Sequence, residues 1–132
     1  MIILKSRQEI EKMRKSNAIV AAILEELAKK IRPGVRTLEL DRFSEELALK
    51  KGARPAFKGY RGYPYSLCAS VNSEVVHGMP SERELKEGDI ISLDFGILND
   101  GYYGDAAVTV PVGAISPEAR RLLTVTEEAL YR

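Results

Sequence analysis

Apolar residues recur at helical spacing near the start of the chain. Between Ile10 and Ile31 they lie mostly three or four positions apart, which is the period of one face of an α-helix. Ser6 and Glu9 precede this stretch in the spacing of a capping box, and Pro33-Gly34 follows it. The pattern predicts one long amphipathic helix whose apolar stripe faces a core.

Two further helices are predicted by the same signals. Thr37 can cap the second helix, and Gly52 is a natural residue to follow its end. Ser116 can cap the third, with Pro117 in its first turn. Their apolar positions are Leu40, Phe43 and Leu47 in the second helix and Leu122, Leu123, Val125 and Leu130 in the third.

The middle of the chain changes from helical to alternating periodicity. Residues 55–65 form a predicted loop rich in tyrosine, glycine and basic side chains, and residues 66–71 form a short strand. After a turn we expect a second short strand over residues 75–77. Two longer strands joined by a tight turn are predicted within residues 92–110.

Each strand of this hairpin carries one aspartate, Asp94 or Asp105. The turn over residues 99–101 allows two registers, with Asp105 opposite either Asp94 or Gly96. Both registers place the two carboxylates on the same face, because side chains alternate along a strand. Their Cβ atoms would then be roughly 4.5–8 Å apart.

The other face of the hairpin is predicted to be core. Its apolar rows are Ile91, Leu93, Phe95 and Ile97 on the first strand and Ala106, Val108 and Val110 on the second. Small residues surround the aspartates on their own face, which leaves room for a cavity. Like charges this close need a shared proton, a basic side chain or a metal ion, unless both are simply solvated.

Composition and charge restrict the class of protein. The chain has 132 residues, 45% hydrophobic and 30% charged, with a net charge of +1. A near-neutral charge argues against a nucleic-acid partner, and no apolar run is long enough to span a membrane. A single cysteine, Cys68, fits a reducing compartment, so we expect a cytoplasmic protein of one domain. Helices, then strands, then a helix favour the α+β class, with helices on one face of a mainly antiparallel sheet.

Two other features are candidates for chemistry. His77, the only histidine, precedes Gly78-Met79-Pro80 and can be structural, hydrogen-bond a substrate, donate a proton or ligate a metal. Tyr60, Tyr63 and Tyr65, among basic residues, can stack on single-stranded nucleic acid, line an apolar pocket or pack on the sheet.

Two aspartates suit a divalent cation such as Mg²⁺, Mn²⁺, Fe²⁺, Co²⁺ or Zn²⁺. A catalytic divalent site needs at least three protein ligands. The residues alone therefore predict part of a metal site.

Several motifs resemble the bacterial, type I methionine aminopeptidases. They are PAFKGY, GYPYSLCASVNSEVVHGMP, GDIISLDFG and YGDAAVT, and the resemblance covers essentially the whole chain. It implies a pita-bread fold, in which two pseudo-symmetric halves enclose two divalent ions (Co, Mn, Fe or Zn) between them. It also implies hydrolytic removal of the initiator methionine, with a peptide or nascent chain beginning with Met as substrate.

The resemblance assigns roles residue by residue. Asp94 matches a bidentate ligand of one metal, and Asp105 matches the aspartate that bridges both. His77 matches a histidine that positions and protonates the reacting groups. Tyr60, Tyr63 and Cys68 match walls of the methionine pocket. For Phe57, where some relatives have a cysteine, it implies only proximity to that pocket.

The family takes a histidine and two glutamate ligands from a second half that this sequence does not contain. Residues 1–132 are therefore expected to be the amino-terminal half of the domain, inactive or weakly active alone. Two other interpretations remain. Two copies could associate through the uncovered sheet face, or the chain could be a non-catalytic module that binds peptide or RNA. Association with the ribosome is also open.

Overall fold

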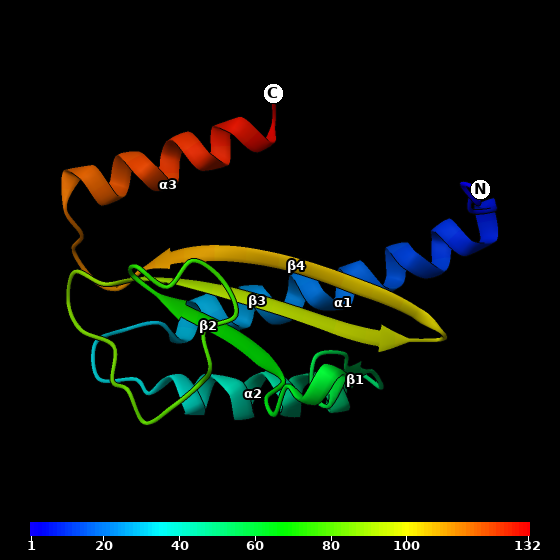
Figure 1. Cartoon of the computed structure of the whole chain (residues 1–132), viewed down its shortest axis with the longest axis horizontal. Helices are drawn as coiled ribbons and strands as arrows, with labels where there is room; N and C mark the ends of the chain where they lie inside the picture. Colours follow the sequence, from blue (N-terminus) through cyan, green and yellow to red (C-terminus); the bar gives the residue numbers. More distant parts are fainter.

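The computed structural model describes all residues from Met1 to Arg132. The chain has three α-helices and a small antiparallel sheet, with α1 and α2 packed on the sheet and α3 apart from it (Figure 1). The elements are α1 (Arg7–Lys30), α2 (Thr37–Lys50), β1 (Arg54–Pro55), the short 3₁₀ helix η1 (Tyr60–Gly62), β2 (Leu67–Val71), β3 (Ile90–Asn99), β4 (Tyr102–Pro111) and α3 (Pro117–Leu130). No helix is both long and apolar enough to cross a lipid bilayer.

The first helix begins with the predicted capping box. The Glu9 N–H donates to Ser6 Oγ at 3.3 Å, and the Ser6 N–H donates to the Glu9 carboxylate at 2.7 Å. Two otherwise free amides are thereby satisfied. Toward its end, α1 buries Val20, Ile23 and Leu27 in the core.

The predicted cap of the second helix is wrong. Thr37 is the first helical residue, and Arg36 precedes it without a capping side chain. The free amides of Thr37 and Leu38 donate instead to the carbonyls of Arg83 and Ser81, at 3.1 and 2.9 Å. A distant segment therefore satisfies the start of α2, which local sequence does not reveal.

Strand β3 organises the sheet. It pairs with β4 over its full length, while β2 and β1 pair with different parts of it, all antiparallel. Helices α1 and α2 cover one face, and the connection from β2 to β3 passes over the other (Figure 1). The predicted core row on β3 is confirmed, since Ile91, Leu93, Phe95 and Ile97 are fully buried.

The predicted core row on β4 is only partly buried. Ala106 is exposed, Val108 is 38% exposed, and Val110 alone packs against the core. Helix α1 approaches β4 most closely at Gly104, where a Cβ would lie 2.5 Å from the backbone of Ser16. The third helix has the predicted cap at Ser116, but it buries no residue and extends away from the sheet (Figure 1).

The strand predicted over residues 75–77 does not form. That segment is irregular, and Val75 and Val76 are exposed. Only Gly78, one residue further on, bonds to the sheet, by accepting the Ala69 N–H at 2.9 Å. Residues 75–78 therefore make a single backbone hydrogen bond with β2, and they pass over the sheet as a loop.

Candidate functional site

The two hairpin aspartates lie on the face of the sheet opposite the helices. Asp100 and Gly101 have φ values of 48° and 78°, so the turn is centred between them. Asp105 is therefore opposite Gly96, and Asp94 is opposite Ala107. Of the two registers that the sequence allows, the structure adopts the one that places the carboxylates on a diagonal.

Neither carboxylate has a basic partner. No Lys, Arg or His nitrogen lies within ion-pair distance of Asp94 or Asp105. Burial, followed by the negative charge of Asp105, raises the pKa of Asp94 above its ordinary value. The backbone N–H of Asp105 donates to Asn17 of α1 at 3.3 Å. The site is therefore a pair of acids without an ion-pair partner in direct contact.

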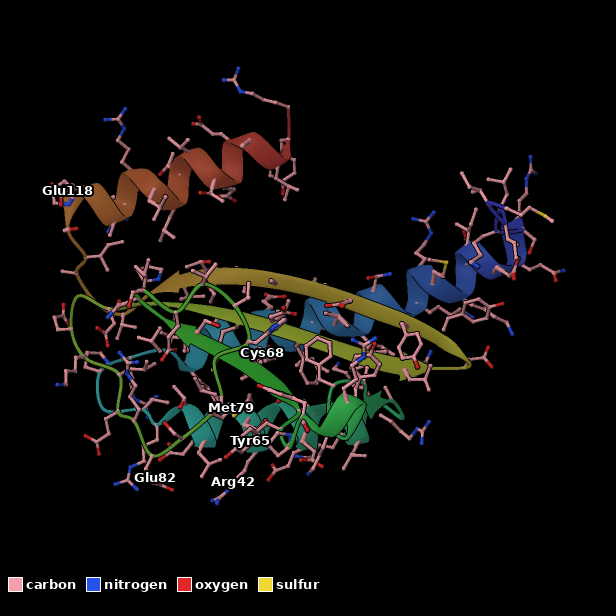
Figure 2. The ribbon with its side chains drawn as sticks, viewed as in Figure 1. Arg42, Tyr65, Cys68, Met79, Glu82 and Glu118 are labelled. Carbon is pink, nitrogen blue, oxygen red and sulfur yellow. The ribbon has the colours of Figure 1, made fainter.

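Cys68 lies beside this pair. It is directly opposite Asp94 in the β2–β3 ladder and is buried, with only 5% of its surface exposed. It projects from β2 near the middle of the sheet (Figure 2). Burial raises the pKa of its thiol, and the nearby aspartates raise it further. At neutral pH Cys68 is a neutral, small wall residue.

The tyrosines of the loop are arranged unequally. Tyr63 lies edge-on to Tyr65, with ring centroids 6.1 Å apart, and its hydroxyl donates to the Leu67 carbonyl at 2.9 Å. Burial raises the pKa of Tyr63, with a further contribution from the adjacent Cys68. Tyr60, on η1, is 64% exposed and has Arg61 over its ring. The structure therefore places Tyr63 next to Cys68 and leaves Tyr60 largely exposed to solvent.

A phenylalanine also belongs to this surface. A Cβ on Gly96 would lie 2.6 Å from the ring of Phe57, so the ring covers the strand position opposite Asp105. The sequence alone implied for Phe57 only proximity to the pocket. The signal for its position is Gly96, among the small residues around the aspartates, because a glycine on a strand leaves space for an aromatic ring.

His77 approaches the aspartates from the loop after β2. Its φ is +59°, in the left-handed region that few non-glycine residues adopt. Burial raises the pKa of Asp94, whereas the electrostatic effect of the nearby His77 lowers that pKa. The N–H of the next residue, Gly78, donates to Ser70 Oγ on the face that carries Asp94, so the segment with His77 lies on the same side of the sheet as the aspartates.

The donor set fits part of a metal centre. Two carboxylates without a counter-ion are suitable ligands for a hard divalent cation. No three side chains from His, Cys, Asp and Glu come together as a metal-ligating group. The residues of this chain could therefore contribute two ligands to a shared ion.

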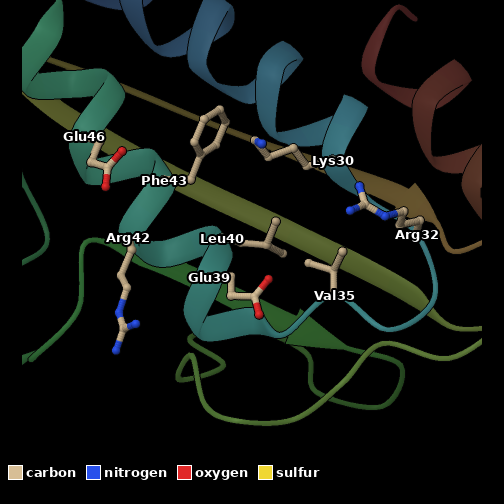
Figure 3. Close-up of a pocket in the computed structure, with 8 residues that line it drawn as sticks. All are labelled: Lys30, Arg32, Val35, Glu39, Leu40, Arg42, Phe43 and Glu46. Carbon is tan, nitrogen blue, oxygen red and sulfur yellow. The ribbon is translucent and has the colours of Figure 1, made fainter.

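A separate pocket of about 290 Å³ lies between the end of α1 and α2 (Figure 3). Lys30 lies over the ring of Phe43, with 4.2 Å between its ammonium nitrogen and the ring centroid. None of the predicted site residues lines this pocket, so it is not part of the candidate site.

Comparison with known proteins gives a family match. Residues 11–132 match the model of metallopeptidase family M24. The chain is 51% identical over 132 residues to the methionine aminopeptidase of Clostridium perfringens. It is 53% identical over the same length to methionine aminopeptidase 1 of Bacillus subtilis. These alignments include the whole of this chain but only 53% of the length of each relative.

Solved structures agree with this match. The methionine aminopeptidase of Thermotoga maritima superposes with a TM-score of 0.96 at 46% identity. The superposition includes 99% of this chain and 53% of the Thermotoga maritima chain. The Rickettsia prowazekii enzyme gives a TM-score of 0.97 at 33% identity, with the same coverage. The fold is therefore the α+β half of a pita-bread domain, as the resemblance implied.

Proposed function

Because the chain belongs to metallopeptidase family M24, we propose that residues 1–132 form the part of a methionine aminopeptidase that supplies two metal ligands and a methionine pocket. The chain spans about half the length of its curated relatives, so the activity, substrate and metals are inferred for the larger assembly. The observation that carries the proposal is the pair of unbalanced carboxylates on one face of the hairpin.

Asp94 and Asp105 would hold one or two divalent ions, of Co, Mn, Fe or Zn. An ion held there would act as a Lewis acid on the carbonyl that follows the first methionine. Two carboxylates are fewer than the three protein ligands that catalytic sites require. Further ligands must therefore come from outside residues 1–132 or from a second copy.

The surrounding residues would bind and orient the substrate. Tyr63, Cys68 and Phe57 provide an apolar wall beside the carboxylates, which suits an unbranched, polarisable methionine side chain. Tyr60 would close the rim of this pocket. His77 would donate a hydrogen bond to the substrate at the reacting carbonyl, or move a proton there.

Hydrolysis of a short peptide that begins with Met-Ala tests this function. We expect the purified chain with Mn²⁺ or Co²⁺ to cleave it weakly, and Asp105→Asn to remove the cleavage. Asp100→Asn, in the turn of the same hairpin, should leave it unchanged. Equal cleavage by the parent and Asp105→Asn would contradict the assignment. Absence of cleavage in all three proteins would limit the proposal to metal binding.

A further inference from the structure

His77 lies on a segment with very few attachments. Val75, Val76 and Met79 are 86, 63 and 62% exposed, and His77 itself is exposed. Within residues 75–80, Gly78 is the only residue that makes hydrogen bonds. Pro80 is buried and holds the end of the segment, so next to His77 itself the only anchor is Gly78.

Gly78 is held by groups on and next to β2. Its N–H donates to Ser70 Oγ at 3.0 Å, and its carbonyl accepts the Ala69 N–H at 2.9 Å. The Tyr63 hydroxyl also lies 3.3 Å from that carbonyl. A Cβ at residue 78 would lie 2.4 Å from the Ala69 carbonyl oxygen, so glycine is needed for the loop to approach this closely.

Ser70 is the one side chain on the sheet that bonds to this loop. It is 4% exposed and lies on the face that carries Asp94, two positions further along its strand than Cys68. Its hydroxyl therefore links the aspartate-bearing sheet to the peptide bond that follows His77.

We propose that Ser70 is a positioning residue for His77: by accepting the Gly78 N–H, it fixes the histidine relative to the Asp94–Asp105 pair. The inference rests on the proposed function, in which His77 acts on a substrate held at those aspartates. A loop without this bond would keep the histidine but lose its defined placement, as the exposure of its neighbours indicates.

The test uses nuclear magnetic resonance on the metal-free chain. Since His77 is the only histidine, its imidazole signals need no further assignment. In Ser70→Ala we expect the Gly78 amide to exchange with solvent about tenfold faster, because one buried hydrogen bond is lost. The His77 ring signals should move toward those of an unstructured peptide.

Ser92→Ala is the matched control. Ser92 lies opposite Ser70 on the neighbouring strand and bonds to Thr109 at 2.9 Å, not to the loop. The His77 signals of Ser92→Ala should match those of the parent chain. Identical His77 and Gly78 signals in the parent and Ser70→Ala would overturn the proposal, as would an equal change in Ser92→Ala.

A second variant keeps the test decisive if Ser70→Ala does not fold. Ser70→Cys keeps a side chain of similar size but replaces the hydroxyl with a thiol, a much weaker hydrogen-bond acceptor for the Gly78 N–H, so it should displace the His77 signals in the same direction. Unchanged His77 and Gly78 signals in that variant would overturn the proposal.

Added Mn²⁺ separates this proposal from the proposed function. A metal at the aspartates should broaden the His77 signals of the parent more than those of Ser70→Ala. No broadening in any variant would contradict the metal site. The metal-free comparison would still decide the role of Ser70.

Discussion

Asp94 is a residue whose ionised form opposes folding of the metal-free chain. Burial and the negative charge of Asp105 raise its pKa, so the folded state favours the protonated carboxyl. The unfolded chain ionises at lower pH, and the stability of the metal-free fold therefore falls as pH rises through this window. A bound cation would reverse this penalty, because it favours the ionised form.

Replacing Asp94 should change stability in a pH-dependent manner. With a chelator present, we expect Asp94→Asn to have a higher melting temperature than the parent at pH 7. The gain should disappear near pH 3, where the parent carboxyl is also neutral. Thermal unfolding followed by circular dichroism between pH 3 and 7 measures this.

Asp100→Asn serves as the control for that series. Asp100 is in the same hairpin but is exposed and paired with Lys12 at 3.2 Å. Its replacement should give no comparable gain at neutral pH. A destabilised Asp94→Asn at pH 7 would show that the carboxylate is not under electrostatic stress.

For single residues, the sequence predicts correctly which face of a strand a side chain lies on, because side chains alternate along a strand. The common face of Asp94 and Asp105 follows from strand periodicity alone, but the choice of register depended on the backbone at Asp100 and Gly101. The left-handed φ of His77 could not be predicted. It accompanies the contact of Gly78 with Ala69 and Ser70 of β2, which the strand predicted over residues 75–77 did not include.

At the scale of elements, Asp41 connects α2 to the start of β2. It is 5% exposed, and its Oδ1 accepts the N–H groups of Ser66 and Leu67 at 2.8 and 2.9 Å. Burial raises the pKa of Asp41, and the two backbone bonds partly offset this. This contact fixes where the loop that carries the tyrosines joins the sheet.

Two substitutions at Asp41 should differ strongly. Asp41→Ala leaves two buried amides without an acceptor, and we expect it to destabilise the fold by about 2–4 kcal/mol. Asp41→Asn keeps an acceptor oxygen and removes a buried charge, so its cost should be clearly smaller. Urea unfolding compares them, and equal losses would show that the amide contacts do not matter.

The helices were easier to predict than the contacts that they and the strands make with distant segments. The boundaries of α1 and the start of α3 follow from local caps and turn residues. The start of α2 was missed because its amides bond to Ser81 and Arg83. The strand predicted at residues 75–77 was wrong for a similar reason, since valines favour strands only where a neighbouring strand is available.

At the scale of the whole molecule, one side of the hairpin lacks a cover. Ala106 and Val108 are exposed on the helix side of β4, and α3 buries none of its residues. Exposed apolar surface of this kind is typical of an interaction site. Asp105 projects from the opposite face of the same strand, so a partner packed on Ala106 and Val108 would not by itself reach the two carboxylates.

Self-association is one way to cover this surface. We expect light scattering to show a dimer at high protein concentration, and Val108→Asp to shift it toward the monomer. Val76→Asp, a similar change on the loop over the opposite face, should leave a dimer formed on this surface intact, whereas its loss in Val76→Asp alone would indicate association through the face that carries the aspartates. A parent chain that is monomeric at all concentrations would exclude a second copy as the cover.

The most direct test of the account is a Mn²⁺ titration of the purified chain, followed by the electron paramagnetic resonance signal of free Mn²⁺. We expect weak binding by the parent and by Asp100→Asn, and loss of binding in the double variant Asp94→Asn with Asp105→Asn. Unchanged binding in that double variant, or none in the parent, would contradict the claim that these two aspartates form part of a metal centre.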